Sequence, residues 1–289
     1  MPDRNDAGRE TLRRSSSNRG GQETAAAVWA AVSGLTVGEA WLRRDEPKAP
    51  ELVEKYQHAL EQIARGVPFA YAVGRAAFRA LDLAIDSRAL IPRPETEGLV
   101  ELALNWCRAA RYPVPGTRGV AADIGTGCGC IALALATEGN FDRVIAVERS
   151  PEAAALAREN VALVAPRTPV EVREGNLLEP LAGARCRIIV SNPPYLTEAE
   201  YEGLAPSVGR YEPREALVSG PDGLVATRAL LAGAAALLEP GGVLVLEIDE
   251  RRGGAVRALA HQCRWARIEI HNDLFGRPRY ALAFPREAE

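Results

Sequence analysis

From Val120 onward the chain alternates short apolar runs with helix-like segments, and this alternation constrains its fold more than any other feature. The runs VAADI, RVIAVE, VEVREGN and CRIIVSN have the length and β-branched content of buried strands. GTGCGCIALALA and SPEAAALARENVALV lie between them and are typical of helices, the second with Ser150 as N-cap and Pro151 at its first position. Strands that alternate with helices run parallel, so the pattern predicts a doubly wound α/β sheet.

The remaining segments continue the pattern towards the C-terminal end. Residues 223–238 and 254–263 are predicted to be helices, with the strand GVLVLEID between them. The segment 265–285 is predicted to form two strands around a turn at Gly276. This pair would place an antiparallel strand at the end of the sheet.

The sequence before the sheet divides into three further segments. The polar residues 1–22 predict a disordered extension, residues 23–74 a small helical domain, 75–93 a β-hairpin linker, and 94–289 the α/β domain. Within the helical domain, a stripe of apolar residues repeats at helical spacing: Leu52, Val53, Tyr56, Leu60 and Ile63.

Composition narrows the class of protein. The 289 residues are 47% hydrophobic and 25% charged, as in soluble globular proteins. The net charge of -3 provides no basic footprint for nucleic acid, and no run approaches the roughly 20 apolar residues of a membrane span. The five cysteines form no CxxC pair, and Cys128-x-Cys130 lacks the nearby ligands that a metal needs. We therefore expect a cytoplasmic protein with reduced thiols and no metal.

The glycine turn DIGTGCG lies between the first strand and its helix. Gly125, Gly127 and Gly129 allow a sharp bend and close approach of a ligand to the backbone. The second strand ends at Glu148, about twenty residues later, where a carboxylate can accept hydrogen bonds from ribose hydroxyls. Asn176 follows the third strand and could bond an adenine edge. These residues indicate an adenosine-containing ligand without separating NAD from S-adenosylmethionine.

The stretch VSNPPYL ends the fourth strand on Asn192, Pro193, Pro194 and Tyr195. Prolines cannot continue a sheet ladder, and they fix the backbone. A planar NH2 group could donate one hydrogen to the Asn192 side-chain oxygen and one to the Pro193 carbonyl, with Tyr195 stacked on its face. These residues would hold a poor nitrogen nucleophile in line with an electrophilic methyl group and stabilise the positive charge that develops on it.

Several blocks together resemble the peptide chain release factor glutamine methyltransferase family. They are GVPFAYAVGRAAF, ALIPRPETEGLVE, DIGTGCGCIALALA, ERSPEAAALARENV, IIVSNPPY, EPREALVSGPDGL and DLFGRPRYALA, in the family's order. NPPY alone is shared by many methyltransferases that act on planar NH2 groups, whereas its combination with IPRPETE is far more specific.

The resemblance implies a class I methyltransferase domain with a seven-stranded sheet behind the helical domain. It implies S-adenosylmethionine as methyl donor, S-adenosylhomocysteine as product, and the Gln of the GGQ loop of class 1 release factors as acceptor. Cofactor binding is carried over to Gly125, Thr126, Gly127, Cys128, Gly129, Glu148, Asn176, Leu177 and Asn192. The amide clamp is carried over to Asn192, Pro193, Pro194 and Tyr195, while the block Arg93 to Thr96 lines the site without an assigned role.

Three positions depart from the family pattern. Asn176 stands where Asp is usual, Glu148 where Asp is frequent, and EIDERRGG where EIG followed by Gln is usual. The last departure puts any substrate contact from that loop in doubt. Two other activities remain open at this point: methylation of a glutamine on a ribosomal protein, and methylation of the adenine amino group in DNA or RNA. A binding module without catalytic activity is a further alternative.

Overall fold

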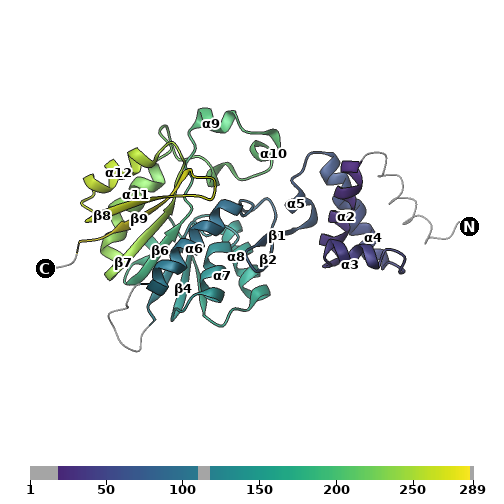
Figure 1. Ribbon diagram of the computed structural model, residues 1–289, viewed down its shortest axis with the longest axis horizontal. Coiled ribbons are helices and arrows are strands. Elements are labelled where there is room, and N and C mark those ends of the chain that lie inside the picture. Colours follow the sequence, from purple (N-terminus) through teal and green to yellow (C-terminus); the bar gives the residue numbers. More distant parts are fainter. Residues whose placement is uncertain (1–18, 110–117, 287–289) are drawn as a thin grey trace, which may run out of the picture. The chain divides into compact units, whose positions relative to one another are not determined.

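The computed structural model describes residues 19–109 and 118–286, which form two compact units (Figure 1). One unit contains the described residues up to Arg75 together with Pro206–Tyr211, and the other contains Ala76–Ala205 and the chain from Glu212 onward. Of the predicted extension, residues 1–18 lie outside the described residues, whereas 19–22 are the first turn of a helix. No helix in these two described ranges has the length and hydropathy of a membrane span.

The first unit is helical and has its own apolar core. Its helices are α2 (Arg19–Ser33), α3 (Val37–Leu42), α4 (Pro50–Ala64), α5 (Phe69–Val73) and the short α10 (Pro206–Gly209). Trp29 of α2 meets Tyr56 of α4 edge-on, with ring centroids 5.4 Å apart. Leu52, Leu60 and Ile63 pack against the same cluster, so most of the predicted stripe on α4 faces the core. The Tyr211 hydroxyl donates to the Arg65 carbonyl at 3.0 Å, which ties the segment after α10 to the end of α4.

A short hairpin follows, within the segment 75–93 that was predicted to be a β-hairpin linker. It consists of β1 (Arg75–Phe78) and β2 (Leu81–Ala84). Arg79 in its turn has a φ of 53°, a left-handed conformation that few non-glycine residues adopt. Its backbone N–H donates to Glu97 and its guanidinium to Glu101 and Glu138, and these bonds hold the turn.

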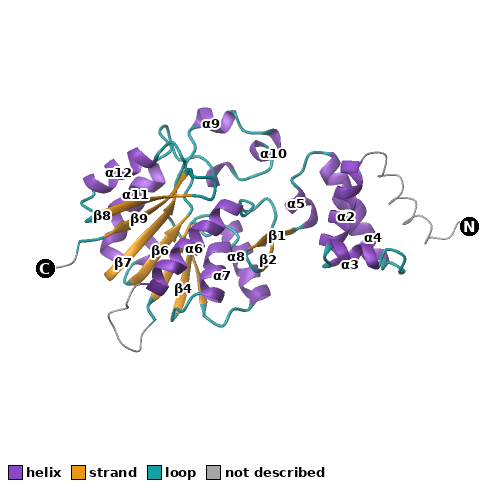
Figure 2. Ribbon diagram, in the orientation of Figure 1, coloured by secondary structure: helices purple, strands orange, loops and turns teal. Residues whose placement is uncertain are grey.

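The second unit is built on the predicted seven-stranded sheet, with strand order β5-β4-β3-β6-β7-β9-β8 (Figure 2). The strands are β3 (Val120–Ile124), β4 (Arg143–Glu148), β5 (Val170–Glu174), β6 (Cys186–Ser191), β7 (Leu238–Glu247), β8 (Arg267–Asn272) and β9 (Pro278–Phe284). Strands β3 to β7 pair in parallel, whereas β9 is antiparallel to both β7 and β8. The predicted antiparallel strand is β9, which lies at this end of the sheet but one position inside its edge, because the chain turns back after β8 and β9 inserts between β7 and β8.

Helices cover both faces of this sheet. All six residues of β6 are buried, which requires cover above and below. Helices α6 (Pro94–Ala109), α7 (Cys130–Glu138) and α8 (Pro151–Val164) pack side by side, and α11 (Val225–Gly233) packs with α12 (Gly253–Gln262). Shorter elements complete the unit: α9 (Glu198–Glu202) and the 3-10 turns Glu179–Leu181, Arg214–Ala216 and Ala234–Leu237. The helix predicted over 223–238 is thus divided between α11 and the last of these turns.

The register of the central strands brings three strand ends to one level. Ile124 at the end of β3 pairs with Val147 of β4 on one side and with Ser191 of β6 on the other. The chain continues along the sheet from β3 to β5 in one direction and from β6 to β7 in the other. This change of direction is the topological switch point at which open α/β sheets bind ligands.

The buried side chain of Asn160, in α8, connects the hairpin to the glycine turn that follows β3. Asn160 Oδ1 accepts from the Ala84 N–H at 2.7 Å, and Nδ2 donates to the carbonyls of Ala84 and Cys128, both at 2.9 Å. Asn160→Ala would leave three backbone groups unpaired, so we expect the free energy of unfolding to fall by about 2–4 kcal/mol in urea titrations. The exposed Asn105→Ala should change it by less than about 0.5 kcal/mol. Equal effects of the two substitutions would contradict this role.

Candidate functional site

The glycine turn after β3 is held by a buried carboxylate. Asp123 Oδ2 accepts from Thr126 Oγ1 at 2.5 Å and from the Ala132 N–H at 3.0 Å. Gly125 and Gly127 have φ values of 73° and 57°, a conformation that strongly favours glycine. A Cβ on Gly125 would meet no atom within 4 Å, so the backbone there is open to a ligand.

Glu148 at the end of β4 closes the same turn. Its Oε2 accepts from the Gly127 N–H at 2.9 Å, and its Oε1 accepts from the N–H groups of Arg149 and Ser150 at 2.7 and 2.9 Å. Each carboxylate oxygen has two lone pairs, so Oε2 retains one acceptor site. The carboxylate is therefore oriented before any ligand binds, and it can still accept a hydrogen bond from a ligand hydroxyl.

The segment after β5 has an unusual backbone. Leu177 has a φ of 47°, which is a strained conformation for a bulky side chain. Gly175 donates its N–H to the Glu148 carbonyl at 2.9 Å, so this segment lies beside the end of β4. Leu177 packs against the core cluster while also lining the cavity described next. Strain of this kind is concentrated at ligand sites.

A cavity of about 600 Å³ lies over these strand ends. Most of the cofactor-binding residues predicted from the sequence line it, namely Gly125, Thr126, Gly127, Cys128, Glu148, Asn176, Leu177 and Asn192, and Pro194 lines it as well. Its size suits a nucleoside-containing ligand, since small-molecule pockets span roughly 300–1,000 Å³. The exposed glycine backbone, the oriented carboxylate and this volume fit S-adenosylmethionine.

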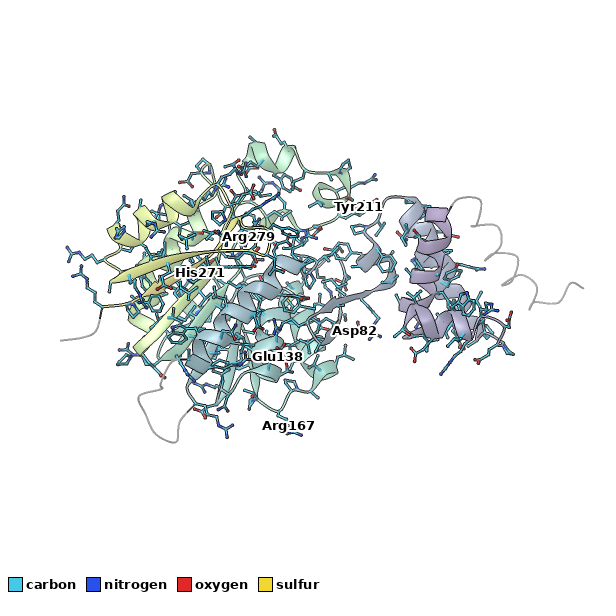
Figure 3. All side chains as sticks on the ribbon, viewed as in Figure 1. Asp82, Glu138, Arg167, Tyr211, His271 and Arg279 are labelled. Atoms are coloured by element: carbon cyan, nitrogen blue, oxygen red, sulfur yellow. The ribbon has the colours of Figure 1, made fainter. Side chains whose placement is uncertain are left out.

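Three predicted residues are not included in the wall formed by the described residues: Gly129, Pro193 and Tyr195. A Cβ on Gly129 would contact Leu133 and Ala157 at 3.5–3.6 Å, so this glycine serves helix packing. Pro193 is buried. Burial raises the pKa of Tyr195 to about 12. The charge of Glu247 also raises this pKa, whereas the charge of Arg279 lowers it. Figure 3 labels Arg279 on β9. The predicted stacking role of Tyr195 thus remains a prediction.

Asn192 follows β6, and a chain of hydrogen bonds through Thr96 to Glu247 holds its side chain. Its Nδ2 donates to Thr96 Oγ1 at 3.1 Å, and Thr96 Oγ1 donates to Glu247 Oε2 at 2.8 Å. Its Oδ1 makes no hydrogen bond to the residues that the structure describes. The residues after Asn192 are fixed by their backbone, because the N–H groups of Tyr195 and Leu196 both donate to the Leu217 carbonyl.

The IPRPETE block, to which the sequence analysis assigned no role, stabilises this site through two sets of hydrogen bonds, one to Glu212 and one made by Thr96. Arg93 Nη2 donates to Glu212 Oε1 at 2.6 Å, and the Ile91 N–H donates to Glu212 Oε2 at 3.3 Å. Both Arg93 and Ile91 line the cavity. The sequence analysis placed Thr96 in the lining of the site, which the structure confirms, but gave it no role. It missed Glu247, for which there was no signal in the sequence beyond its place in a predicted strand.

The EIDERRGG loop, which departs from the family pattern, contacts α9 and the loop before α11 in the same unit. Arg252 Nη2 donates to Glu200 Oε2 at 2.6 Å, and its Nε donates to the Asp222 carbonyl at 3.0 Å. Arg252 Nη1 also lies 3.0 Å from Asp249 Oδ1. These contacts hold the segment that follows NPPY. Among the described residues, no group of three or more His, Cys, Asp or Glu side chains is arranged to hold a metal ion.

Comparisons with known proteins agree with this site. The family described as a methyltransferase small domain matches residues 110–205. A release factor glutamine methyltransferase of Xylella fastidiosa is 44% identical over 250 residues, 86% of this chain and 88% of that protein. Another, of Moorella thermoacetica, is 41% identical over 246 residues, 85% of this chain and 84% of that protein. A methyltransferase structure from Pyrococcus furiosus aligns with a TM-score of 0.52 at 21% identity, over 78% of this chain and 96% of that one.

The strand order, the glycine turn and the cavity at the switch point, taken together with the methyltransferase family model and the named relatives, define a class I methyltransferase that uses S-adenosylmethionine. Within that class, identity above 40% along most of both chains decides the family. The chain belongs to the release factor glutamine methyltransferase family.

Replacing Glu148 tests the cofactor site. Gln has only one acceptor oxygen, so Glu148→Gln must turn an NH2 group towards Gly127 or towards the Arg149 and Ser150 N–H groups. We expect the Kd of S-adenosylmethionine in calorimetric titrations to rise at least about tenfold. Glu174 pairs with Glu148 in register at the end of β5 but lies outside the cavity wall, so Glu174→Gln should change the Kd less than about twofold. A similar Kd for both variants would contradict the assignment.

Proposed function

We propose that this protein transfers a methyl group from S-adenosylmethionine to the side-chain amide nitrogen of the Gln in the GGQ loop of class 1 peptide chain release factors. One observation carries the chemistry: Asn192 lines the cofactor cavity with its NH2 group turned to Thr96, which leaves its amide oxygen as a fixed acceptor. The acceptor protein follows from the names of the relatives, which cover most of their length and of this chain. The protein would act where release factors act, in the cytoplasm.

The roles of the residues follow from the chemistry of an amide nucleophile. S-adenosylmethionine supplies an electrophilic methyl group on a sulfonium and leaves as S-adenosylhomocysteine. An amide nitrogen is a weak nucleophile, so orientation provides much of the catalysis. Asn192 Oδ1 and the Pro193 carbonyl accept hydrogen bonds from the two N–H groups of the substrate amide. They also stabilise the positive charge that develops on its nitrogen. The proton that becomes acidic leaves to water, so no dedicated base is needed.

A ribosomal protein and nucleic acid are weaker candidates for the acceptor. The same Asn192 clamp would hold an adenine amino group, so the geometry of the clamp does not separate these substrates. The net charge of -3 argues against a broad nucleic-acid surface. The relatives that match most of the chain are named for release factors.

The direct test presents the acceptors separately with labelled S-adenosylmethionine: a class 1 release factor, its GGA variant, a ribosomal protein and adenine-containing DNA. We expect label on the release factor alone, at the GGQ glutamine by peptide mass spectrometry. Asn192→Ala should lower kcat at least about a hundredfold with only a partial loss of cofactor affinity, and Asn105→Ala should retain wild-type activity. Label on DNA only, or full activity of Asn192→Ala, would overturn the proposal.

We also propose that the helical unit contacts the release factor away from the glutamine. Trp41 and Leu42 of α3 are large apolar side chains that are 63% and 73% exposed. Replacing both with Ser should raise the KM for intact release factor about fivefold or more, and leave the kcat for a short GGQ peptide unchanged. Leu163→Ser on α8, where the leucine is 57% exposed, is the matched control. An unchanged KM for the intact factor in the double variant would contradict this role.

A further inference from the structure

We propose that Thr96 and Glu247 are positioning residues for the methyl transfer, acting as a buried relay that fixes which way the Asn192 amide faces and strengthens its oxygen as an acceptor. This inference rests on the proposed function, because it concerns the same methyl transfer. The relay crosses three elements: Glu247 ends β7, Thr96 is in the first turn of α6, and Asn192 follows β6.

The sheet brings the two ends of the relay to the same level. Ser191 of β6 pairs in parallel with Leu246 of β7. The next residues in the two segments, Asn192 and Glu247, therefore lie side by side. The Thr96 hydroxyl lies between them, 3.1 Å from Asn192 Nδ2 and 2.8 Å from Glu247 Oε2. Thr96 and Glu247 are 2% and 1% exposed, so water does not compete for these bonds.

The first turn of α6 is locked in place by β9. Tyr280, which pairs with Glu247 in register, donates its hydroxyl to the Glu95 carbonyl at 2.7 Å. A Cβ on Gly98 would lie 2.2 Å from that hydroxyl, so only glycine lets Tyr280 reach the helix. Thr96 therefore has little freedom to leave its place between Asn192 and Glu247.

The hydrogen count then decides the orientation of Asn192. An ionised Glu247 only accepts hydrogen bonds, so the single hydroxyl hydrogen of Thr96 must point to it. Towards Asn192 the Thr96 oxygen can therefore only accept a hydrogen bond, so the Asn192 side chain must donate it from its NH2 group. The Asn192 oxygen is thereby directed away from Thr96. The negative charge of Glu247 also polarises the chain of bonds, which makes that oxygen a stronger acceptor for the substrate amide.

The relay requires the charged form of Glu247. Burial raises the pKa of its carboxyl to about 7; the hydrogen bond from Thr96 and the charges of Arg279 and Arg93 oppose the rise, and Glu95 adds to it. The side chains of Tyr195 and Tyr280 also interact electrostatically with this carboxyl. Above the pKa the carboxylate accepts from Thr96. As the pH falls through about 7, the carboxyl gains a proton and can donate to Thr96, whose own hydrogen is then free to turn to Asn192. The constraint on the amide is lost, so kcat should fall with falling pH.

The test compares variants on the intact release factor. Thr96→Val keeps the shape of the side chain but removes the hydroxyl, and we expect kcat to fall about ten- to a hundredfold while the KM for S-adenosylmethionine stays within about twofold. Thr96→Ser retains the hydroxyl and should stay within about threefold of wild type. A merely structural role of Thr96 would not produce this rescue together with an unchanged KM.

The pH profile isolates Glu247. Burial raises the pKa of Asp123 to about 7 as well, so the wild-type profile alone cannot assign the titrating group. Glu247→Gln removes one of the two carboxyls, and it should lower kcat and abolish its rise between roughly pH 6 and 8. Equal kcat for Thr96→Val and Thr96→Ser, or a wild-type pH rise in Glu247→Gln, would overturn the inference. A wild-type enzyme inactive on release factor would instead overturn the proposed function.

Discussion

The parallel pairing of β3 with both β4 and β6 is the constraint on which the rest of the site depends. Ile124 is in register with Val147 and with Ser191, so the residues that follow these three lie at one level of the sheet. Gly125, Glu148 and Asn192 are those residues. A turn open to a ligand, an oriented carboxylate and an amide clamp thus arise at one edge without any long loop to bring them together.

A second constraint is the cost of burying polar groups at this edge. A carboxylate as buried as Glu247 is destabilising unless hydrogen bonds satisfy it. The Thr96 hydroxyl provides one such bond, and the same hydroxyl holds the Asn192 amide. The buried groups are therefore linked in one network whose members fix each other's orientation. A site that acts chiefly by orientation needs this rigidity more than it needs a strong acid or base.

Local pattern was sufficient to predict the strands, most helices, and the meeting of Gly125, Glu148 and Asn192, because strand ends in a parallel sheet converge. It could not predict contacts that depend on side-chain packing between distant segments. Thr96 meets Asn192 from the first turn of α6, which Tyr280 of the distant β9 holds through the Glu95 carbonyl. The position of β9 inside the edge is likewise a matter of pairing between strands that hydropathy does not encode. Family resemblance drew attention to the IPRPETE block but supplied no role for it.

The central claim is that Asn192 presents its oxygen to a planar amide in the cavity while its NH2 group stays on Thr96. The most direct measurement is a crystal structure of the protein with S-adenosylhomocysteine and a GGQ-containing release factor. We predict that the Gln side-chain nitrogen lies within hydrogen-bond distance of both Asn192 Oδ1 and the Pro193 carbonyl, and that the bond from Asn192 Nδ2 to Thr96 is retained. A glutamine bound away from Asn192, or an Asn192 amide turned so that its oxygen faces Thr96, would contradict this claim.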